Sequence, residues 1–556
     1  MSKMVSLQTT LIEKPENNNH IAESYKGIYS MHKYWSKKPF NVIRNFILNY
    51  TKKNEIVVDP FCGSGISVTE SILTGRKAIG VDINPSAIFI TKQMLTKISS
   101  RELNEEFRKL ELECKDKINS FYLVKRGNKQ FIGTHFLWDC GKLMEVWYNN
   151  GKGRNRKIID APTDEDLKVV SSFSYNKIPY YFPKRNFFHN SRINANREKH
   201  IYDLFTPRNL TALSFLLDRI EKIENEDIGE MLKFCFTSSV GQASNMVFVV
   251  KRRGKFNGQT RKTEKKEVGS WVIGYWMPKE NFEINAWNCF ENKFKKILKA
   301  KKEQEHAKYS LNEASNLEEL FKPTKNLLLV NDSAIKVLGN VPDNSIDYVI
   351  TDPPHGNRMP YLEQSMMWNE WLKKDVNYDD EIVISESKDR NKDINDYYHL
   401  LNEVLENIER ILKPERYFSL MFNSLDDDTW INLIKFLNGL NFDLHKVETL
   451  GYSANSVVQD NRGAGLKTDF IFTFRKNPNK VKKEIELYNI NQHKSIFIEM
   501  IDGYTKKSRN GLEIYEILNN LVIDLLKQGK FFKLSEVLTI IKKEYDKIGN
   551  KWVKRV

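Results

Sequence analysis

The residue group best suited to chemistry in this chain is the tetrapeptide Asp352-Pro353-Pro354-His355. It follows the apolar run 346–351, which has the length and composition of a buried strand. Because open α/β sheets bind ligands at the carboxyl ends of their strands, we expect the Asp352 carboxylate at a ligand-binding edge. The prolines fix φ, so the carboxylate and the Pro353 carbonyl are held as rigid hydrogen-bond acceptors. The alternative is a turn carboxylate that caps the next helix.

A second pattern of strand, turn and helix lies far upstream. The run 56–58 leads into Asp59-Pro60-Phe61-Cys62-Gly63-Ser64-Gly65, a helix is expected from about Ser67, and a second strand, 78–81, ends at Asp82. In such β-α-β units glycines let the backbone approach a ligand, and an acidic residue about 20 positions on accepts from ribose hydroxyls. The third glycine of the dinucleotide fingerprint is missing, so the turn suits a nucleoside without phosphates. The structural alternatives are Asp82 as a helix N-cap and Asp59 as a turn residue.

These motifs resemble a known family. The segment 59–65 resembles motif I of the S-adenosylmethionine-dependent amino-methyltransferases of DNA, and 352–355 resembles their motif IV, which usually ends in Tyr, Phe or Trp. Segment 31–39 is similar to motif X, which precedes motif I. Segments 204–210 (LFTPRNL) and 368–372 (WNEWL) look like signatures of a large bacterial subgroup of adenine-specific DNA methylases. The resemblance extends from about residue 20 to 476.

The resemblance implies a set of site residues. The implied catalytic residues are Asp352, Pro353, Pro354 and His355. The implied cofactor-binding residues are His32, Tyr34, Trp35, Pro39, Asp59, Pro60, Phe61, Gly63, Gly65, Asp82 and Asp332, of which Asp332 matches the polar residue beside the adenine ring of the cofactor. For His32 and Trp35, a surface loop at a helix entry is the alternative. We expect no metal, because the histidines show no His-x-x-x-His spacing and no Cys-x-x-Cys pair is present.

The chemistry that the resemblance implies is methylation of an exocyclic amine. The lone pair of that amine is delocalised into the ring, so catalysis needs acceptors for both amine hydrogens, which the Asp352 carboxylate and the Pro353 carbonyl can provide. Asp at the first position of motif IV favours adenine N6 in double-stranded DNA, with cytosine N4 as the alternative. An RNA amino-methyltransferase and a non-catalytic nucleic-acid-binding protein are also compatible with these motifs. His355 stands where an aromatic ring normally stacks on the flipped base, and Tyr361 could supply the missing ring.

Composition favours a globular enzyme with a polyanionic partner. The 556 residues carry a formal net charge of +15 and 40% hydrophobic residues, which suits more than one domain and an anionic partner such as nucleic acid. A generally lysine-rich surface is the alternative reading of the charge. There is no apolar run of 18 residues and no signal-peptide segment, so we expect a cytoplasmic protein with no membrane partner. The five cysteines are far apart and are expected to be free thiols.

The basic charge is concentrated in residues 251–266, which contain eight basic side chains and one acidic one. We expect a flexible loop that contacts nucleic-acid phosphates, next to the aromatic residues Trp271, Tyr275 and Trp276. The alternative is a solvated loop beside a core strand. The candidate nucleic-acid-binding residues are Lys251, Arg252, Arg253, Lys255, Arg261 and Lys262.

The pattern of elements predicts an α/β fold, a Rossmann-like methyltransferase sheet interrupted by a large α+β insertion. We expect residues 1–97 to form its first part, 98–325 the insertion with the target-recognition function, and 326–478 its second part. Residues 479–556 are Lys-rich, and their period predicts a small helical region, either a DNA-contacting or dimerising appendage or a packing helix pair. The recognition sequence, a cognate restriction endonuclease and the oligomeric state stay open.

Overall fold

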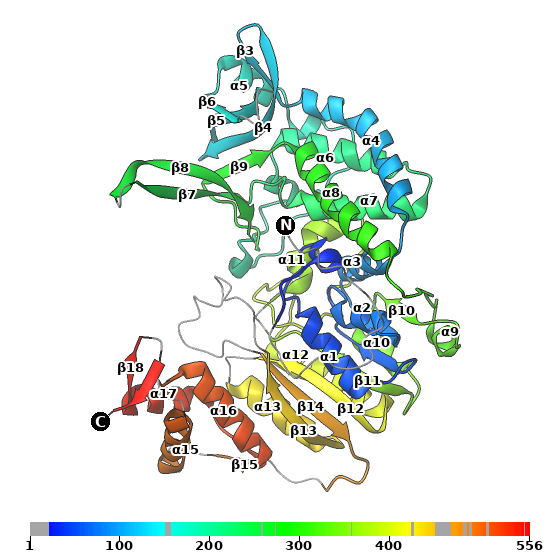
Figure 1. Ribbon diagram of the computed structural model, residues 1–556, viewed down its shortest axis with the longest axis vertical. Helices are drawn as coiled ribbons and strands as arrows, with labels where there is room; N and C mark the ends of the chain where they lie inside the picture. The colour runs from blue at the N-terminus through cyan, green and yellow to red at the C-terminus, as the bar shows by residue number, and fades with distance from the viewer. Residues whose placement is uncertain are drawn as a thin grey trace, which may run out of the picture.

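The structure is a computed structural model that describes residues 22–150, 157–256, 259–272, 274–356, 359–423, 427–450, 469–481, 486–488, 492–507, 511–549 and 551–555, with the backbone alone over 252–265. Figure 1 shows two large lobes, one above the other, and a smaller C-terminal module beside the lower lobe. In the described part of the chain no helix is both long and apolar enough to cross a membrane. None of the five cysteines forms a disulfide.

The lower lobe contains a seven-stranded sheet with the order β10-β2-β1-β11-β12-β14-β13. The first five of these strands pair in parallel, and β14 is antiparallel to both of its neighbours. The strands are β1 Ile56–Asp59, β2 Lys77–Val81, β10 Leu327–Val330, β11 Ile346–Thr351, β12 Leu412–Phe422, β13 Phe442–Thr449 and β14 Phe470–Lys476. Strand order reverses between β1 and β11, which is where open α/β sheets bind ligands.

Helices cover both faces of this sheet, as a parallel sheet requires. Side chains alternate along a strand, so Val57 packs in a cluster with Phe46 of helix α1, whereas Val58 packs with Leu405 of helix α12. The strands predicted at 56–58, 78–81 and 346–351 are confirmed, as is the helix expected from about Ser67, which begins at Ile66. The helices are α1 Phe40–Tyr50, α2 Ile66–Leu73, α3 Pro85–Leu95, α10 Ala334–Gly339, α11 Tyr361–Trp371, α12 Ile394–Ile411 and α13 Asp427–Gly439.

The upper lobe is built from the chain between α3 and β10 and has a sheet of its own. Its strand order is β6-β5-β4-β9-β7-β8, and β3 pairs with β4. The strands are β3 Leu123–Arg126, β4 Lys129–Asp139, β5 Lys142–Asn149, β6 Lys157–Asp160, β7 Val247–Phe256, β8 Gln259–Trp271 and β9 Glu280–Ile284. The helices are α4 Ser100–Ser120, α5 Asp164–Ser171, α6 Pro207–Ile220, α7 Glu226–Val240 and α8 Ala286–Glu305, whereas the short α9 Leu317–Phe321 lies beside β10 of the lower lobe. Helix α6 is capped by Thr206, whose side chain accepts from Asn209 N.

Two expectations about local structure were wrong. Residues 251–266 were expected to form a loop, but they belong to the antiparallel hairpin β7–β8, which projects from the upper lobe (Figure 1). The C-terminal region is not purely helical. Between its helices α15 Lys494–Lys507, α16 Ile514–Lys527 and α17 Leu534–Glu544 lie the short strands β16 Leu512–Glu513 and β17 Lys530–Phe531. Strand β15 Glu486–Leu487 precedes them, and β18 Tyr545–Ile548 and β19 Lys551–Lys554 follow.

Candidate active site

A pocket of about 910 Å³, including the space open to solvent, lies at the carboxyl ends of β1, β2 and β11. Residues 380–382 and the start of α11 form further walls. The two motifs that are far apart in the sequence therefore border one cavity at the reversal point of the sheet. The predicted site residues that line it are Tyr34, Trp35, Asp59, Pro60, Phe61, Gly63, Asp82, Asp352 and Pro354.

Asp59 organises the turn after β1. Its Oδ1 accepts hydrogen bonds from Phe61 N at 3.1 Å and from Thr351 Oγ1 at 2.7 Å, and its Oδ2 accepts from Ser67 Oγ. Thr351 is the last residue of β11, so Asp59 joins the two strand ends that carry the two motifs. Burial raises the pKa of Asp59 to about 6. With these partners, Asp59 holds the turn in shape at the floor of the pocket.

The two glycines of this turn have different roles. Gly63 has φ +51°, and a Cβ there would lie 3.1 Å from the Tyr34 ring inside the pocket wall. Gly65 has φ +72°, and a Cβ there would lie 2.3 Å from Thr91 of α3. Gly65 does not line the pocket, so its lack of a side chain serves the packing of α2 against α3, while Gly63 brings the backbone to the cavity.

Asp82 lies at the end of β2 and borders the pocket. It accepts hydrogen bonds from Gly63 N at 2.8 Å and from Asn84 N at 2.9 Å. The side chain that caps α3 is Asn84, which accepts from Ser86 N, so the alternative reading of Asp82 as the helix N-cap was wrong. Burial raises the pKa of Asp82 to about 7. Asp332 follows β10 and accepts from Ser333 N, and the pocket is lined there by Ser333 and Ala334 instead.

Asp352 lies between two basic side chains at the mouth of β11. Its Oδ2 is 3.0 Å from Lys38 Nζ, and its Oδ1 is 3.1 Å from His355 Nε2 without hydrogen-bond geometry. Lys38 Nζ also lies 2.7 Å from Asp469 Oδ2. Lys38 lies in the segment similar to motif X, but sequence analysis assigned it no role. Only the fold reveals this ion pair, because its partners are far apart in the chain.

The rest of the tetrapeptide is held by packing. Tyr397 of α12 donates a 2.7 Å hydrogen bond to the Pro354 carbonyl, and Pro353 is buried. His355 does not line the pocket; its ring packs against the Phe422 ring at 4.9 Å. Tyr361 does line it, and its ring lies nearly parallel to that of Tyr34 at 6.5 Å. These two tyrosines therefore form part of the aromatic surface of the cavity, together with Trp35 and Phe61.

Some of the predicted residues in segment 31–39 line the pocket, and others lie in the core. His32 is fully buried, where its Nε2 contacts Thr237 Oγ1 at 3.2 Å and its ring meets Trp368 edge-on. Burial lowers the pKa of His32 to about 3, so it is a neutral core histidine joining the two lobes rather than a pocket residue. Pro39 is the N-cap residue of α1 and does not line the pocket. Trp35 lines the cavity and stacks on Trp368 at 4.8 Å.

The two subgroup signatures meet at the junction of the lobes. Phe205 of the first packs edge-on against Trp371 of the second, with ring centroids 5.9 Å apart. Arg208 of the first makes a buried ion pair with Glu283 at 2.7 Å. Asn369 accepts from Ser86 N at 3.0 Å, which ties α11 to the start of α3 beside the pocket. Both signatures thus hold the pocket walls in place.

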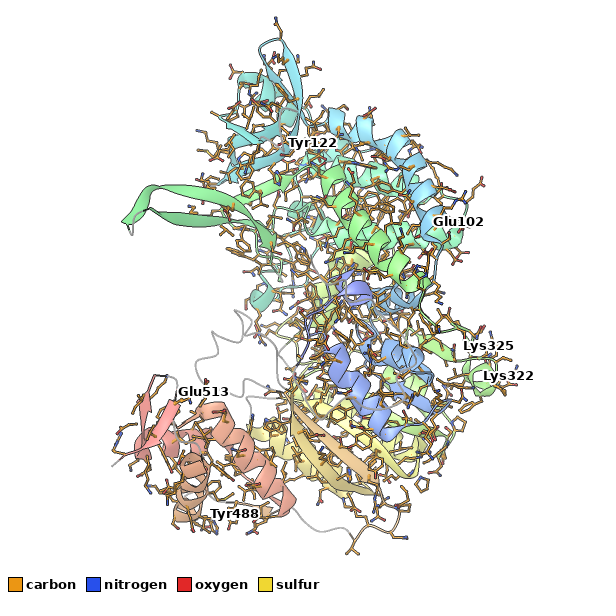
Figure 2. The ribbon with its side chains drawn as sticks, viewed as in Figure 1. Glu102, Tyr122, Lys322, Lys325, Tyr488 and Glu513 are labelled. Carbon is orange, nitrogen blue, oxygen red and sulfur yellow. The ribbon has the colours of Figure 1, made fainter. Side chains whose placement is uncertain are left out.

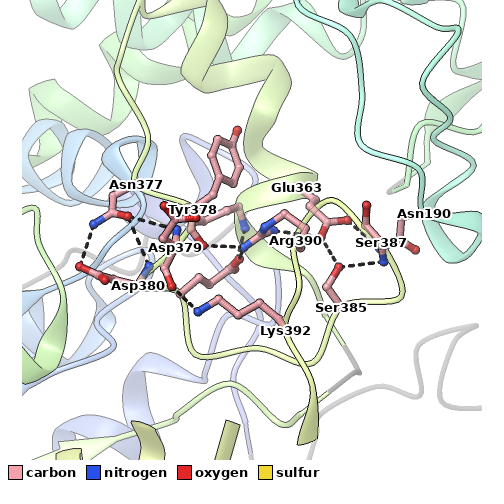
Figure 3. A network of polar contacts seen from close by, with 12 residues as sticks. Asn190, Glu363, Asn377, Tyr378, Asp379, Asp380, Ser385, Ser387, Arg390 and Lys392 are labelled. Carbon is pink, nitrogen blue, oxygen red and sulfur yellow. Dashed lines mark hydrogen bonds and ion pairs between the residues drawn. The ribbon is translucent and has the colours of Figure 1, made fainter. Parts of the chain in front are cut away.

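A buried polar network supports the wall formed by residues 380–382 (Figure 3). Arg390 donates to Glu381 Oε2 at 2.5 Å and to Glu363 Oε1 at 2.9 Å. Asn190 of the upper lobe donates to Glu363 Oε2 at 2.7 Å. Glu381 lines the pocket, and burial raises its pKa. Sequence analysis missed this residue because its segment has no periodic pattern. No cluster of side chains suited to a metal ion occurs in the described part of the chain.

The candidate nucleic-acid-binding residues all lie on the hairpin β7–β8. Lys251, near its base, makes an ion pair with Glu280 Oε2 at 2.5 Å. The side chains of Arg252, Arg253, Lys255, Arg261 and Lys262 lie outside the described residues, although their backbone belongs to the two strands. Trp271 and Tyr275 are buried, and Trp276 is exposed.

The N-terminal part of the chain matches a family of known proteins. Residues 7–93, which include the turn after β1 and the end of β2, match the family described as DNA methylase. The match therefore covers one side of the pocket.

Several curated proteins are similar to this chain. Type II methyltransferase M.MjaII of Methanocaldococcus jannaschii is 25% identical over 215 residues, 37% of this chain and 38% of that protein. Type II methyltransferase M.MvaI of Kocuria varians is 22% identical over 360 residues, 62% of this chain and 58% of that protein. Type II methyltransferase M2.LlaDCHI of Lactococcus lactis subsp. cremoris is 37% identical over 65 residues, 12% of this chain and 24% of that protein. The chain thus spans less than two thirds of the length of these relatives.

Proposed function

We infer that this chain, a relative of the N6/N4 family of DNA amino-methyltransferases, methylates an exocyclic amine of a base in double-stranded DNA, with adenine N6 as the acceptor. The observation that carries this proposal is that Asp352 and Asp82 border the same pocket at the reversal point of the sheet. A site for the methyl donor and an acceptor for the amine hydrogens are thereby adjacent.

The pocket suits S-adenosylmethionine. That cofactor carries a sulfonium and an ammonium group, and when bound it supplies the methyl group as an electrophile. The lining includes the carboxylates of Asp59 and Asp82, which complement positive charge when they are ionised. At Gly63 the backbone approaches the cavity without a side chain, and the ring of Tyr34 offers an apolar surface. We assign the ribose hydroxyls to Asp82, whose carboxylate already orients the turn through Gly63 N.

Asp352 and Pro353 act on the amine of the acceptor base in this proposal. Among the described residues Asp352 Oδ1 makes no hydrogen bond, with His355 Nε2 3.1 Å away, and we assign to this oxygen the acceptance of one amine hydrogen. The Pro353 carbonyl accepts the other, and Lys38 holds the carboxylate through Oδ2. The acceptors need no reorganisation during transfer, because the prolines and the Tyr397 hydrogen bond fix the backbone. A base in a duplex reaches this pocket only by flipping out, which costs a few kcal/mol.

The upper lobe is assigned to target recognition. It carries the basic hairpin β7–β8 and joins the pocket wall through Asn190, so contacts to the duplex can be coupled to the position of α11. These contacts would offset the cost of base flipping. Cytosine N4 is the second candidate acceptor, because the same acceptors serve either amine. RNA methylation and binding without catalysis are the rival functions that the experiment must separate from DNA methylation.

The first experiment is incubation of the full chain with labelled S-adenosylmethionine and unmethylated genomic DNA, followed by nucleoside mass spectrometry. We expect N6-methyladenine with the wild type and none with Asp352→Ala. Cofactor affinity, measured by calorimetry, should be nearly unchanged in that variant, because we assign the donor site to Asp82 and Gly63 of the pocket lining and not to Asp352. Detection of N4-methylcytosine instead would identify cytosine N4 as the acceptor. Activity retained by Asp352→Ala would refute the catalytic role of Asp352, and no affinity for the cofactor would favour a binding protein.

A further inference from the structure

The C-terminal module, residues 486–555, has a topology that the sequence did not predict. Helix α15 is followed by β16, α16, the two-residue strand β17, α17 and the hairpin β18–β19. Strand β17 pairs with β15, outside the sheet that β16, β18 and β19 form. Strand β19 lies between β16 and β18 and is antiparallel to both. This is the order of a winged helix-turn-helix, in which α16 and α17 are the helix pair and β18–β19 is the wing. In helix-turn-helix proteins the second helix faces the major groove of DNA.

The module is packed against the lower lobe. Its buried residues Phe497, Leu521 and Ile541 belong to the same apolar cluster as α12 and α13. The ring of Phe531 packs against Trp430 of α13 at 6.1 Å. At the start of α17, Ser535 Oγ donates to Asp427 of α13 at 2.5 Å. Any ligand of the module is therefore held in a defined position relative to the pocket.

These contacts leave one surface of the module open. The first turn of α17 faces α13, and Val537 and Ile541 point into the core. Thr539, Lys542 and Lys543 are exposed on the second half of the helix. On the wing, Lys547 is exposed, Lys551 is half-exposed, and Ile548 at the tip is 67% exposed.

The charge of this surface is strongly positive. Residues 530–555 contain eight Lys or Arg and three Asp or Glu side chains. Two of the three acids are already paired, Glu544 with Lys494 and Asp546 with Arg555. Within the described residues, no ion pair occupies Lys542, Lys543, Lys547 or Lys551; these four lysines are called the wing lysines below. An isolated apolar side chain among lysines at a hairpin tip suits a nucleic-acid groove.

We propose that the C-terminal module is a second binding site for duplex DNA, in which the wing lysines contact phosphates and Ile548 enters a groove. Figure 1 shows the module and the hairpin β7–β8 projecting toward the same side of the molecule. In this proposal the duplex is contacted at two places, the hairpin of the upper lobe and the C-terminal module. This binding goes beyond methyl transfer, because it requires neither the cofactor nor Asp352.

The test compares two full-length variants, each of which has lost four positive charges relative to the wild type. The wing variant carries Lys542→Gln, Lys543→Gln, Lys547→Gln and Lys551→Gln. The control carries Lys299→Gln, Lys302→Gln, Lys308→Gln and Lys322→Gln, all exposed lysines outside the module. Figure 2 shows Lys322 at the edge of the molecule opposite Glu513 of the module. Binding to a fluorescent duplex of about 30 base pairs is measured without cofactor from about 50 to 300 mM salt.

We expect the wing variant to bind the duplex at least about tenfold more weakly than the wild type at roughly 100 mM salt. The slope of log affinity against log salt concentration should fall by about 3. The control should bind like the wild type. In an Asp352→Ala background the wing substitutions should lower DNA affinity by the same factor. This result does not depend on methyl transfer, so it tests the second binding site even if the methyltransferase proposal fails. Unchanged binding by the wing variant, or an equal loss in the control, would overturn the proposal. Loss of self-association in sedimentation, with DNA binding unchanged, would reassign the surface to a second copy of the chain.

Discussion

Lys38 and Asp352 form an ion pair across the pocket, with Nζ 3.0 Å from Oδ2, and the lysine also contacts Asp469 at 2.7 Å. Their side chains are about nine-tenths buried, so the lysine compensates two carboxylates that water reaches poorly. The segment before α1, the end of β11 and the start of β14 are thereby joined at the point where the acceptor base is proposed to bind. The ion pair therefore links the stability of the fold to the geometry of the proposed catalytic site.

Replacement of Lys38 by Met should destabilise the protein by about 3 kcal/mol, because it leaves two carboxylates uncompensated in a poorly hydrated site. In the Asp352→Ala background the same replacement should cost clearly less, because one of the two carboxylates is gone. Urea unfolding of the four proteins of this double-mutant cycle measures the coupling. Equal costs in both backgrounds would show that the contact between Lys38 and Asp352 contributes little.

Cofactor affinity should rise with pH between about 5.5 and 7.5. Burial raises the pKa of Asp82 to about 7 and that of Asp59 to about 6, so both bind protons below neutrality. A cationic ligand favours the ionised carboxylates, and its binding must therefore release protons as the pH falls through this range. Calorimetry in buffers of different ionisation enthalpy counts these protons. Asp82→Asn should bind more weakly and lose most of the pH dependence, whereas Asp332→Asn should change neither.

The same raised pKa values predict the pH dependence of stability without ligand. Between an ordinary carboxyl pKa near 4 and the folded-state value of about 7 for Asp82, the folded protein binds more protons than the unfolded chain. The contribution of this group to the free energy of unfolding therefore falls as the pH rises from about 4 to 7 and is constant above. Urea unfolding of wild type and Asp82→Asn should diverge toward pH 7, with the variant gaining relative stability. A constant difference across this range would contradict the burial effect.

The two glycines of the turn should respond differently to alanine. Gly65→Ala places a methyl group 2.3 Å from Thr91 at φ +72°, so we expect a loss of more than about 2 kcal/mol of folding free energy. Gly63→Ala meets only the edge of the Tyr34 ring at 3.1 Å, so it should cost less stability but weaken cofactor binding at least tenfold. Thermal unfolding and a cofactor titration separate the two effects. Equal changes in both variants would show that the glycines share one role.

Sequence alone predicted the elements with strong local patterns. The buried runs of β1, β2 and β11 and the residues after them were placed correctly, and the structure brings Asp59, Asp82 and Asp352 to one pocket. Contacts between distant segments left no local signal, which is why the role of Lys38 and that of Glu381 were not predicted. The strands of the C-terminal module are two to four residues long, too short to produce a periodic pattern. The hairpin β7–β8 was mistaken for a loop because runs of consecutive charged residues, such as 251–253 and 264–267, conceal the alternation of apolar and polar residues typical of a strand.

Neutralising the hairpin should flatten the salt dependence of DNA binding. Strands β7 and β8 pair over most of residues 247–271, so basic residues on both strands are held along one projecting element. Each phosphate contact contributes about 0.9 to the slope of log affinity against log salt. Replacing Arg252, Arg253, Lys255, Arg261 and Lys262 by Gln should therefore reduce the slope by up to about 4.5, without changing cofactor affinity. The control is Lys251→Gln, whose side chain already pairs with Glu280 and should contribute less than one unit. An unaltered slope in the five-residue variant would leave the hairpin as a solvated arm, and DNA binding would then depend on the pocket rim and the wing lysines.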